Sequence, residues 1–521
     1  MIKDLKNMSL DEKIGQLFVV GFNGTHYTEK LDELINKYKF GNIILFTRNI
    51  SSMEDLFNLN KEIQKNMMEK LNTPAFICID QEGGMVTRLF KGATIFPGAM
   101  TLSATGDINN AYLNGLYMAE EMDALGLNVN FAPVLDVNTN PLNPGIGVRS
   151  YSDNQKVAAE YGKKFIEGIQ TKVFATAKHF PGKGDAAVDA HLGLPVVEHD
   201  LERLEKVEFV PFKEAIDANV KGVMTSHAIY PVLNKDYPAT LAKEVLIDLL
   251  RNKYKFKGLV FTDGMEMQAI DDKYGAAKSA VTAVLAGADL LLYCHYEEQQ
   301  IAAFNYVKEA VLEGTIPMEV LDDRVKRILK HKKEISLKYL EKSFDEIKER
   351  INKEEHQNFA KEVINNALTL VKGERFNKKD KTLFIIQKPK ALTLVEEASG
   401  EDSAVIKLEK ALPEYKFIVS DVNPNKEEIL KLVSESCYYN QVILTTYNSN
   451  MYEGQVELIK TFLKTKKELH VISLRNPYDL HLVPEIENYV CLYEYTSNSV
   501  NALISYLKGN LEPQGKLPVK I

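Results

Sequence analysis

Eight short runs of apolar residues, spaced regularly over the first 315 residues, constrain the fold more than any other feature of this sequence. The runs are rich in Val, Ile, Leu and Phe, and their nearly continuous hydrophobicity is typical of strands buried on both faces of a parallel sheet. They are LFVVGF (17–22), NIILF (42–46), FICID (76–80), VNFAPVLDV (129–137), VFATAKHF (173–180), GVMTSHAIY (222–230), GLVFTDG (258–264) and DLLLYC (289–294).

Longer amphipathic stretches separate these runs. Residues 51–71 and 154–170, for example, carry apolar residues at the spacing of one helix face. Strands that alternate with helices indicate βαβ units and a parallel α/β sheet. Eight such units in about 300 residues predict a (β/α)8 barrel. A doubly wound sheet of eight strands is the alternative.

A second, shorter block of alternating runs begins near residue 375. Its five apolar runs predict a smaller C-terminal α/β sandwich domain and lie at 382–387, 415–422, 441–447, 469–474 and 489–495. The segment before it is rich in Lys and Glu, which favours solvated helices. We therefore expect a barrel over residues 1–340, a helical linker over 341–374 and the sandwich domain over 375–521.

Charge and cysteine content argue against several classes of protein. The chain has 64 Lys and Arg against 72 Asp and Glu, a net charge of −8, so we expect no nucleic-acid partner. Four cysteines without a C-x-x-C pair argue against a disulfide scaffold or a thiolate zinc site. We expect Cys78, Cys294 and Cys491 to be core residues. No apolar run reaches the ~18 residues of a membrane span, and no signal peptide is visible, so we expect a cytoplasmic protein. An exported protein whose signal peptide has been removed would show the same pattern.

Polar residues gather at the C-terminal ends of four predicted barrel strands. They are Asp80, then Lys178 and His179, then Thr225, Ser226 and His227, and finally Asp263. In a (β/α)8 barrel these ends meet at the face where active sites are built. Because buried ionisable groups are costly unless they are paired, this convergence predicts a site for a polar ligand.

Asp189 and His191 lie two residues apart in the loop that follows the fifth run. In an extended segment the carboxylate can orient the imidazole and raise its pKa, which suits a general acid/base. A surface loop with incidental polar residues is an alternative interpretation. His179, Asp189 and His191 could also form a metal ligand set, but nothing else in the stretch completes a favoured site, so we expect no metal.

Two of the aspartates at strand ends have structural alternatives. Asp263 is followed three residues later by Glu266, which is the pattern of a helix capping box. Its place at the end of an apolar, β-branched strand favours a functional role. Asp80 could instead form a turn ahead of Gly83 and Gly84.

The stretch KHFPGKGDAAVDAHLGLP (178–195) resembles the signature of glycoside hydrolase family 3, in the NagZ-like β-N-acetylglucosaminidase branch. Further stretches resemble that family in the order of its barrel: FICIDQEGGMVTRL (76–89), NFAPVLDVN (130–138), GVRSYS (147–152), GVMTSHAIYP (222–231) and LVFTDGMEM (259–267). SLRNPYDL (473–480) and GKLPV (515–519) resemble its C-terminal domain.

The resemblance implies a role for each matching residue. Asp263 corresponds to the nucleophile, His191 to the general acid/base and Asp189 to the aspartate paired with that histidine. The residues that correspond to the sugar-binding positions of the −1 subsite are Asp80, Arg88, Arg149, Lys178 and His179. The visible departure is Lys183, because many relatives have His there.

The resemblance also implies a retaining exo-β-N-acetylglucosaminidase, a β-N-acetylhexosaminidase that hydrolyses terminal β-linked GlcNAc without a metal or organic cofactor. The expected substrates are GlcNAc-MurNAc fragments of peptidoglycan in a recycling pathway, and chito-oligosaccharides come next. A phosphorylase is one alternative, because a neutral histidine base repels phosphate less than a carboxylate would. A non-catalytic sugar-binding protein is the other.

Overall fold

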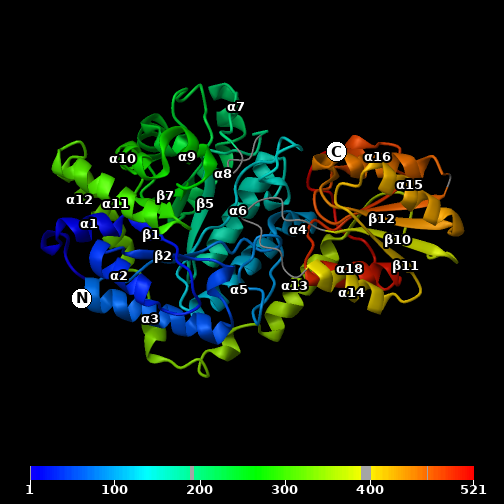
Figure 1. Ribbon diagram of the computed structural model, residues 1–521, viewed down its shortest axis with the longest axis horizontal. Helices are drawn as coiled ribbons and strands as arrows, with labels where there is room; N and C mark the ends of the chain where they lie inside the picture. The colour runs from blue at the N-terminus through cyan, green and yellow to red at the C-terminus, as the bar shows by residue number, and fades with distance from the viewer. Residues whose placement is uncertain (1, 188–192, 389–400, 466) are drawn as a thin grey trace.

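The computed structural model of the protein describes residues 2–187, 193–388, 401–465 and 467–521. Within these ranges eight parallel strands pair in sequence order and close into a barrel (Figure 1). They are β1 (Phe18–Val20), β2 (Asn42–Leu45), β3 (Ile77–Ile79), β4 (Val129–Asn130), β5 (Phe174–Phe180), β6 (Gly222–Thr225), β7 (Leu259–Gly264) and β8 (Leu290–Tyr293). The predicted (β/α)8 barrel is confirmed, and the doubly wound alternative is wrong because β1 pairs with β8.

Helices surround the barrel strands (Figure 1). They are α1 (Leu10–Gln16), α2 (Glu29–Tyr38), α3 (Met53–Leu71), α4 (Ala99–Ala104), α5 (Asn109–Ala124), α6 (Gln155–Ile169), α7 (Leu201–Lys206), α8 (Val210–Asp217), a π-helix (Glu244–Lys253), α9 (Gln268–Tyr274), α10 (Ala276–Ala286), α11 (Glu297–Leu312), α12 (Met318–Lys332) and α13 (Glu354–Ala367). Local sequence sets their ends. The Ser52 hydroxyl, for example, caps α3 by accepting from the Asp55 N–H.

The barrel strands are buried on both faces, as their continuous apolar runs predict. Every residue of β1, β2, β3, β6 and β8 is buried. Strand β4 ends at Asn130, well before the end of the expected run at 129–137, and Val134 of that run pairs with Lys178 in an isolated bridge. Strand β5 is longer and carries Lys178 and His179 to the C-terminal end of the barrel.

The second part of the chain forms a mixed sheet with helices on both faces. In the described residues the strand order is β11-β10-β12-β13-β14-β9, and β9 is antiparallel to β14. The strands are β9 (Thr369–Lys372), β10 (Thr382–Gln387), β11 (Lys416–Ser420), β12 (Gln441–Thr446), β13 (Glu468–Ser473) and β14 (Asn488–Cys491). The α/β sandwich is therefore confirmed, and β9 is an edge strand inside the range expected to be a linker.

Two hydrophobic clusters cover the two faces of this sheet. One includes Leu432 and Phe462, and the other includes Leu408 and Leu503. The helices of this part are α14 (Glu401–Ala411), α15 (Lys426–Glu435), α16 (Glu453–Leu463), α17 (Asp479–Leu482) and α18 (Ser497–Leu507). Cys78, Cys294 and Cys491 are buried, as the sequence predicts.

The barrel and the second sheet share a core and several hydrogen bonds. Met100, Ala104 and Val148 of the barrel belong to a hydrophobic cluster of the second sheet. The buried carboxylate of Glu494 accepts hydrogen bonds across this boundary from the Gly98 N–H at 2.9 Å and the Thr101 hydroxyl at 2.7 Å. The two parts therefore meet through apolar packing and through polar groups whose partners lie on the other part.

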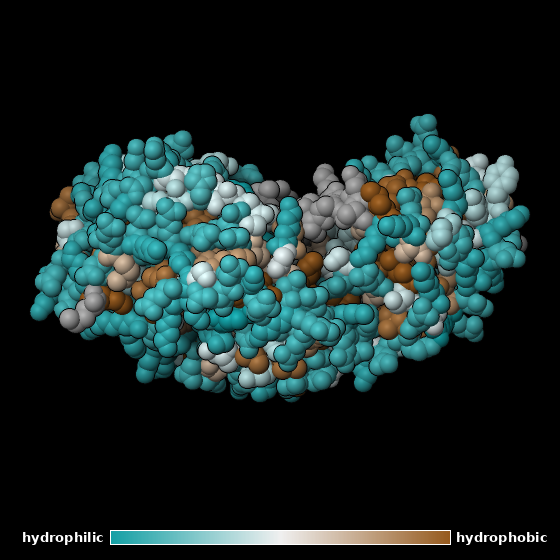
Figure 2. Space-filling view, turned by 90° about the horizontal axis from the view of Figure 1, so that it is seen from below, coloured by the Kyte–Doolittle hydropathy of each residue, from teal (hydrophilic) through white to brown (hydrophobic). Residues whose placement is uncertain are grey.

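Hydrophilic residues cover most of the face shown in Figure 2, and hydrophobic residues appear there in scattered groups. Across the described ranges, none of the helices combines the length and the hydrophobicity that crossing a bilayer requires.

Replacing Glu494 with Ala should destabilise the protein because it leaves buried donors on the barrel without an acceptor. Each such loss costs about 1–3 kcal/mol, so we expect the free energy of unfolding to fall by about 2 kcal/mol or more. Thermal and urea unfolding measure the change. Glu487→Ala, which alters an exposed carboxylate of the same part, is the control. Equal stability of Glu494→Ala and wild type would contradict the role given to this contact.

Candidate active site

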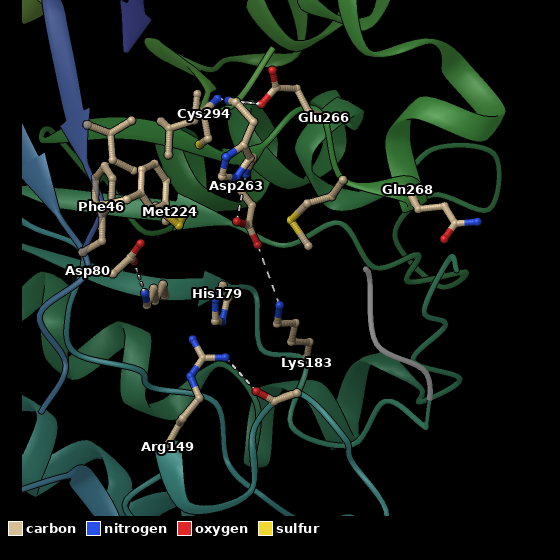
Figure 3. A pocket seen from close by; sticks show the side chains of 18 of the residues that line it. Phe46, Asp80, Arg149, His179, Lys183, Met224, Asp263, Glu266, Gln268 and Cys294 are labelled. Carbon is tan, nitrogen blue, oxygen red and sulfur yellow. Dashed lines mark hydrogen bonds and ion pairs between the residues drawn. The ribbon is translucent and has the colours of Figure 1, made fainter. Parts of the chain in front are cut away.

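A cavity of about 280 Å³ opens at the C-terminal ends of the barrel strands (Figure 3). Strands β2 to β8 each contribute a residue at or just beyond this end. The polar lining residues are Asp80, Arg88, Arg149, Lys178, His179, Lys183, Asp263, Glu266, Gln268 and His295, and the apolar ones include Ile44, Phe46, Phe131, Met224, Met267 and Leu292. All six predicted site residues that the structure describes line this one cavity.

The other two predicted residues, Asp189 and His191, lie in segment 188–192, outside the described residues. Nearby Asp185, the other carboxylate of this loop, is described. It accepts from the Thr139 hydroxyl at 2.8 Å and pairs with His199 at 2.7 Å. Asp185 is thus held by two partners and does not appear in the lining of the cavity.

Asp263 lies at the end of β7 with one carboxylate oxygen directed into the cavity (Figure 3). Its Oδ1 accepts a hydrogen bond from the Gly264 N–H at 2.8 Å. Its Oδ2 lies 3.8 Å from Nζ of Lys183, and 17% of the side chain is exposed. A carboxylate that is anchored by one oxygen and faces the cavity is suited to attack an electrophile there.

The interpretation of Asp263 and Glu266 as a helix capping box is wrong. Helix α9 begins at Gln268, and Met267 is its N-terminal cap. Glu266 instead accepts hydrogen bonds at 2.6–2.9 Å from the backbone N–H groups of residues 294, 295 and 296, just before α11. Glu266 therefore ties the loop after β7 to the loop after β8 at the edge of the cavity.

Four charged side chains form a buried network on the opposite wall. Arg149 donates from Nε and Nη2 to the two oxygens of Glu82, at 2.9 and 2.7 Å. Lys178 donates to Asp80 at 2.9 Å and pairs with Glu82 at 2.7 Å. Arg88 adds a longer contact, with Nη2 3.8 Å from Asp80 Oδ2. Buried charges are tolerated when they are paired in this way.

The network keeps Glu82 and Lys178 charged. Burial alone would raise the pKa of Glu82, but Arg149 and Lys178 lower it to about 2. Burial alone would lower the pKa of Lys178, yet Asp80 and Glu82 leave it above the usual value for lysine. The cavity wall therefore presents fixed cations and carboxylates, which are strong partners for the hydroxyl groups of a bound ligand.

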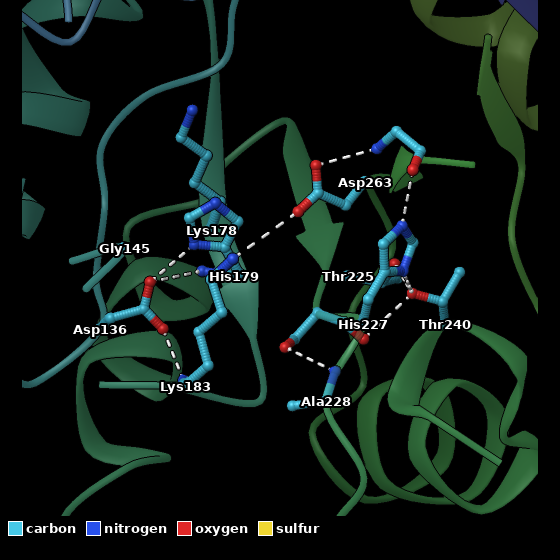
Figure 4. A network of polar contacts seen from close by, with 12 residues as sticks. Asp136, Gly145, Lys178, His179, Lys183, Thr225, His227, Ala228, Thr240 and Asp263 are labelled. Carbon is cyan, nitrogen blue, oxygen red and sulfur yellow. Dashed lines mark hydrogen bonds and ion pairs between the residues drawn. The ribbon is translucent and has the colours of Figure 1, made fainter. Parts of the chain in front are cut away.

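His179 is held by a second buried carboxylate, Asp136 (Figure 4). Its Nδ1 lies 2.7 Å from Asp136 Oδ2, and its backbone N–H contacts the same oxygen at 3.2 Å. Burial, together with the nearby Lys183, Arg149 and Lys178, holds the pKa of His179 well below its usual value. A neutral ring that donates from Nδ1 to Asp136 keeps Nε2 as an acceptor for a ligand.

The sequence places Thr225, Ser226 and His227 at the site, but they are fully buried and do not appear in the cavity lining. The hydroxyl of Thr225 bonds to that of Thr240 at 2.7 Å, and His227 bonds from Nδ1 to the same hydroxyl at 2.7 Å (Figure 4). His227 Nε2 contacts the Gly264 carbonyl oxygen at 2.8 Å. His227 therefore supports the end of β7, and Met224 lines the cavity from β6.

Four charged residues at or beside the cavity are not identified as site residues by the sequence patterns. They are Glu82, Asp136, Lys183 and Glu266. Glu82 stands two residues after Asp80, and Asp136 interrupts an apolar run, so each carries a usable signal: a carboxylate in a buried segment needs a partner. Lys183 and Glu266 have partners from loops distant in sequence, which no local pattern reveals.

A metal centre finds no support in the described part of the chain, where no group of three or more His, Cys, Asp and Glu side chains could hold an ion. Of the alternative ligand set, only His179 is described, and it is bonded to Asp136.

The sequence profile described as "Glycosyl hydrolase family 3 N terminal domain" matches residues 9–331. The chain is 36% identical over 282 residues to beta-hexosaminidase A of Pseudoalteromonas piscicida, covering 50% of this chain and 47% of that protein. It is 31% identical over 330 residues to a beta-hexosaminidase of Idiomarina loihiensis, covering 62% of this chain and 96% of that protein. The chain thus spans about half the length of the first relative and nearly all of the second.

A solved structure resembles both parts of the fold. It is a glycoside hydrolase family 3 beta-N-acetylglucosaminidase from Paenibacillus sp. str. FPU-7, with 35% sequence identity and a TM-score of 0.90. The similarity covers 98% of this chain and 99% of that one, so it includes the barrel and the second sheet together.

Replacing Glu82 with Gln should destabilise the protein in a pH-dependent way, because it removes the carboxylate that Arg149 and Lys178 share. A pKa lowered from 4.5 to about 2 corresponds to a stabilisation on the order of 3 kcal/mol. The folded-state pKa is depressed, so this contribution is complete above about pH 4.5 and is lost as the pH falls toward 2.

Thermal unfolding of wild type and Glu82→Gln between pH 7 and pH 3.5 measures this dependence. The gap between the two proteins should be widest at neutral pH and should narrow toward the acid end. Glu202→Gln, at a carboxylate whose side chain is 75% exposed, is the matched control. A gap that does not depend on pH would show that packing, and not charge, is what the substitution disturbs.

Proposed function

Since this chain belongs to glycoside hydrolase family 3, we propose that it is a retaining exo-β-N-acetylglucosaminidase with Asp263 as its nucleophile. The observation that carries the proposal is the placement of Asp263. Its carboxylate stands at the end of a barrel strand and faces a cavity of about 280 Å³ whose other wall is a network of paired charges. That volume is close to the lower end of the range for small-molecule sites.

The reaction we propose has two steps. In the first, an Asp263 oxygen attacks the anomeric carbon, and His191, protonated, gives a proton to the departing glycosidic oxygen. In the second, His191, now neutral, takes a proton from water, and the water oxygen displaces Asp263 from the same carbon. Asp189 supports the charged imidazolium of His191. Two displacements at one carbon retain its configuration.

The paired charges suit the hydroxyl groups of the sugar in the −1 subsite. Asp80 and Lys178 hold one another at 2.9 Å, and Arg149 is fixed by Glu82, so these groups are in place before a sugar arrives. Arg88 and His179 complete the polar lining. Preorganised charged groups lose little conformational freedom on binding, which favours affinity and orientation. The apolar lining provides surface for the faces of a pyranose and for an acetamido methyl group.

The substrate we propose is a terminal β-linked GlcNAc. The similarity to two proteins named beta-hexosaminidase and to a beta-N-acetylglucosaminidase supports this sugar. GlcNAc-MurNAc fragments of peptidoglycan are the proposed natural source, and chito-oligosaccharides are second. Release of GlcNAc from each class measures the preference, and GlcNAc-1-phosphate formed on addition of phosphate would identify phosphorolysis in place of hydrolysis.

We assign this chemistry to the barrel, which we place in a domain spanning residues 1–340. No residue of the second sheet is among the described residues that line the cavity. The linker over 341–374 and the domain over 375–521 would then support the site without supplying a group that touches the sugar.

Replacing Asp263 with Ala should lower kcat for an aryl β-GlcNAc glycoside by about 10³-fold or more, because the covalent route is lost. Added azide should partly restore turnover of a substrate with a good leaving group and give a glycosyl azide of inverted configuration. Asp248→Ala, at an exposed position on the π-helix, is the control. Near-wild-type rates for Asp263→Ala would contradict the assignment of the nucleophile.

The loss of rate caused by replacing His191 with Ala should depend on the leaving group of the substrate. Activated aryl glycosides need little acid assistance and should lose less in the first step than poor leaving groups, while the covalent intermediate accumulates for lack of a base. Asp189→Asn should lower the rate of hydrolysis by about 10²-fold. Rates against aryl leaving groups of graded pKa measure both, with the exposed His26→Ala as the control. Equal losses for every leaving group, without a trapped intermediate, would assign the acid/base role elsewhere.

A further inference from the structure

Lys183 brings a positive charge beside the carboxylate that we propose as nucleophile (Figure 3). Its Nζ lies 3.8 Å from Asp263 Oδ2, and only 11% of its side chain is exposed. In the described ranges of the chain, Asp263 is the one carboxylate within 4 Å of this ammonium group. The separation is longer than a hydrogen bond, so Lys183 acts on Asp263 through charge.

Two cations of the buried network have different partners from Lys183. Lys178 and Arg149 contact Asp80 and Glu82 at 2.7–2.9 Å, on the wall that we assign to sugar hydroxyls. In the described residues Lys183 makes no ion pair with Asp80 or Glu82, and its ion pair is with Asp263. Its charge also acts on His179 and Asp136, but its position beside the carboxylate that we propose as nucleophile distinguishes it from Lys178 and Arg149.

The backbone of Lys183 is fixed independently of its side chain. The Lys183 N–H donates to Asp136 Oδ1 at 2.6 Å, and its carbonyl oxygen accepts from Asn143 Nδ2 at 2.8 Å. The next residue, Gly184, packs so closely that a Cβ there would lie 1.9 Å from the Val137 carbonyl oxygen. A substitution at Lys183 can thus change the charge while the loop keeps its backbone contacts.

The charge on Asp263 changes in opposite directions in the two proposed steps. In the first, the bond from Asp263 to the anomeric carbon forms while the bond to the leaving oxygen breaks, and the carboxylate loses its negative charge as an ester. In the second, water adds to that carbon and the ester bond breaks. Its electron pair returns to Asp263, which regains its charge. A nearby cation stabilises the charged carboxylate and therefore affects the two steps differently.

We propose that Lys183 is a positioning residue that speeds release of the sugar from Asp263, because its ammonium group stabilises the carboxylate as it departs. The proposal rests on the proposed function. By the same interaction Lys183 stabilises free Asp263 and gives no help to the first step. Lys183 therefore favours rapid breakdown of the covalent intermediate over rapid formation of it.

The test compares Lys183→Met with Lys183→Arg on 2,4-dinitrophenyl β-GlcNAc in rapid-quench experiments. The burst of dinitrophenol gives the rate of the first step, and the steady state gives the second. For Lys183→Met we expect the steady-state rate to fall by about 10- to 100-fold, while the burst rate and kcat/KM stay equal or rise and KM falls. Lys183→Arg keeps the charge and should stay within about threefold of wild type.

The exposed Lys206→Met, at a side chain with 69% exposure, is the matched control and should behave as wild type. Equal losses in kcat and kcat/KM for Lys183→Met, or the same loss in Lys183→Arg, would overturn the proposal in favour of a role in sugar binding or packing. An unchanged second step would also overturn it. These failures are distinct from failure of the proposed function, in which wild type itself gives neither turnover of the GlcNAc glycoside nor a burst.

Discussion

The mutual neutralisation of four largely buried charges at the mouth of the barrel is the constraint on which the rest of the site depends. Asp80, Glu82, Arg149 and Lys178 are each costly to remove from water, and they are tolerated there only as a connected set. They come from the loops after β3 and β4 and from β5 itself, so their pairing fixes three strand ends relative to one another. The charged wall of the cavity and the stability of the barrel mouth thus have one physical cause.

The second sheet contributes to this wall without lining the cavity. Asn476 accepts a hydrogen bond from the Val148 N–H at 3.1 Å, next to Arg149. Gly147 stands in the left-handed region with φ of 49°, and a Cβ there would lie 2.4 Å from Asn476 Oδ1. The segment that carries Arg149 is therefore held against the second sheet, in a contact that only glycine allows.

The sequence by itself determined the architecture and much of the site. Eight continuous apolar runs specify a parallel sheet buried on both faces, and their number and spacing favour a closed barrel, which the pairing of β1 with β8 then decides. Because parallel strands end at one face, the polar residues that follow those strands can be grouped into one site by their positions along the chain. The order of the family motifs adds Arg88 and Arg149, which lie in loops that no periodicity identifies. All the predicted site residues that the structure describes line one cavity.

Only the tertiary structure decided which polar groups meet. His227 stands at a strand end like His179, yet it bonds to Thr240 and supports β7, while His179 pairs with Asp136 and lines the cavity. Lys183 approaches Asp263 from a loop far away in the sequence. Sequence patterns indicate which segments are buried, since the hydrophobicity that causes burial is a property of each segment. Ion pairs depend on distances between segments, and those distances exist only once the barrel has closed.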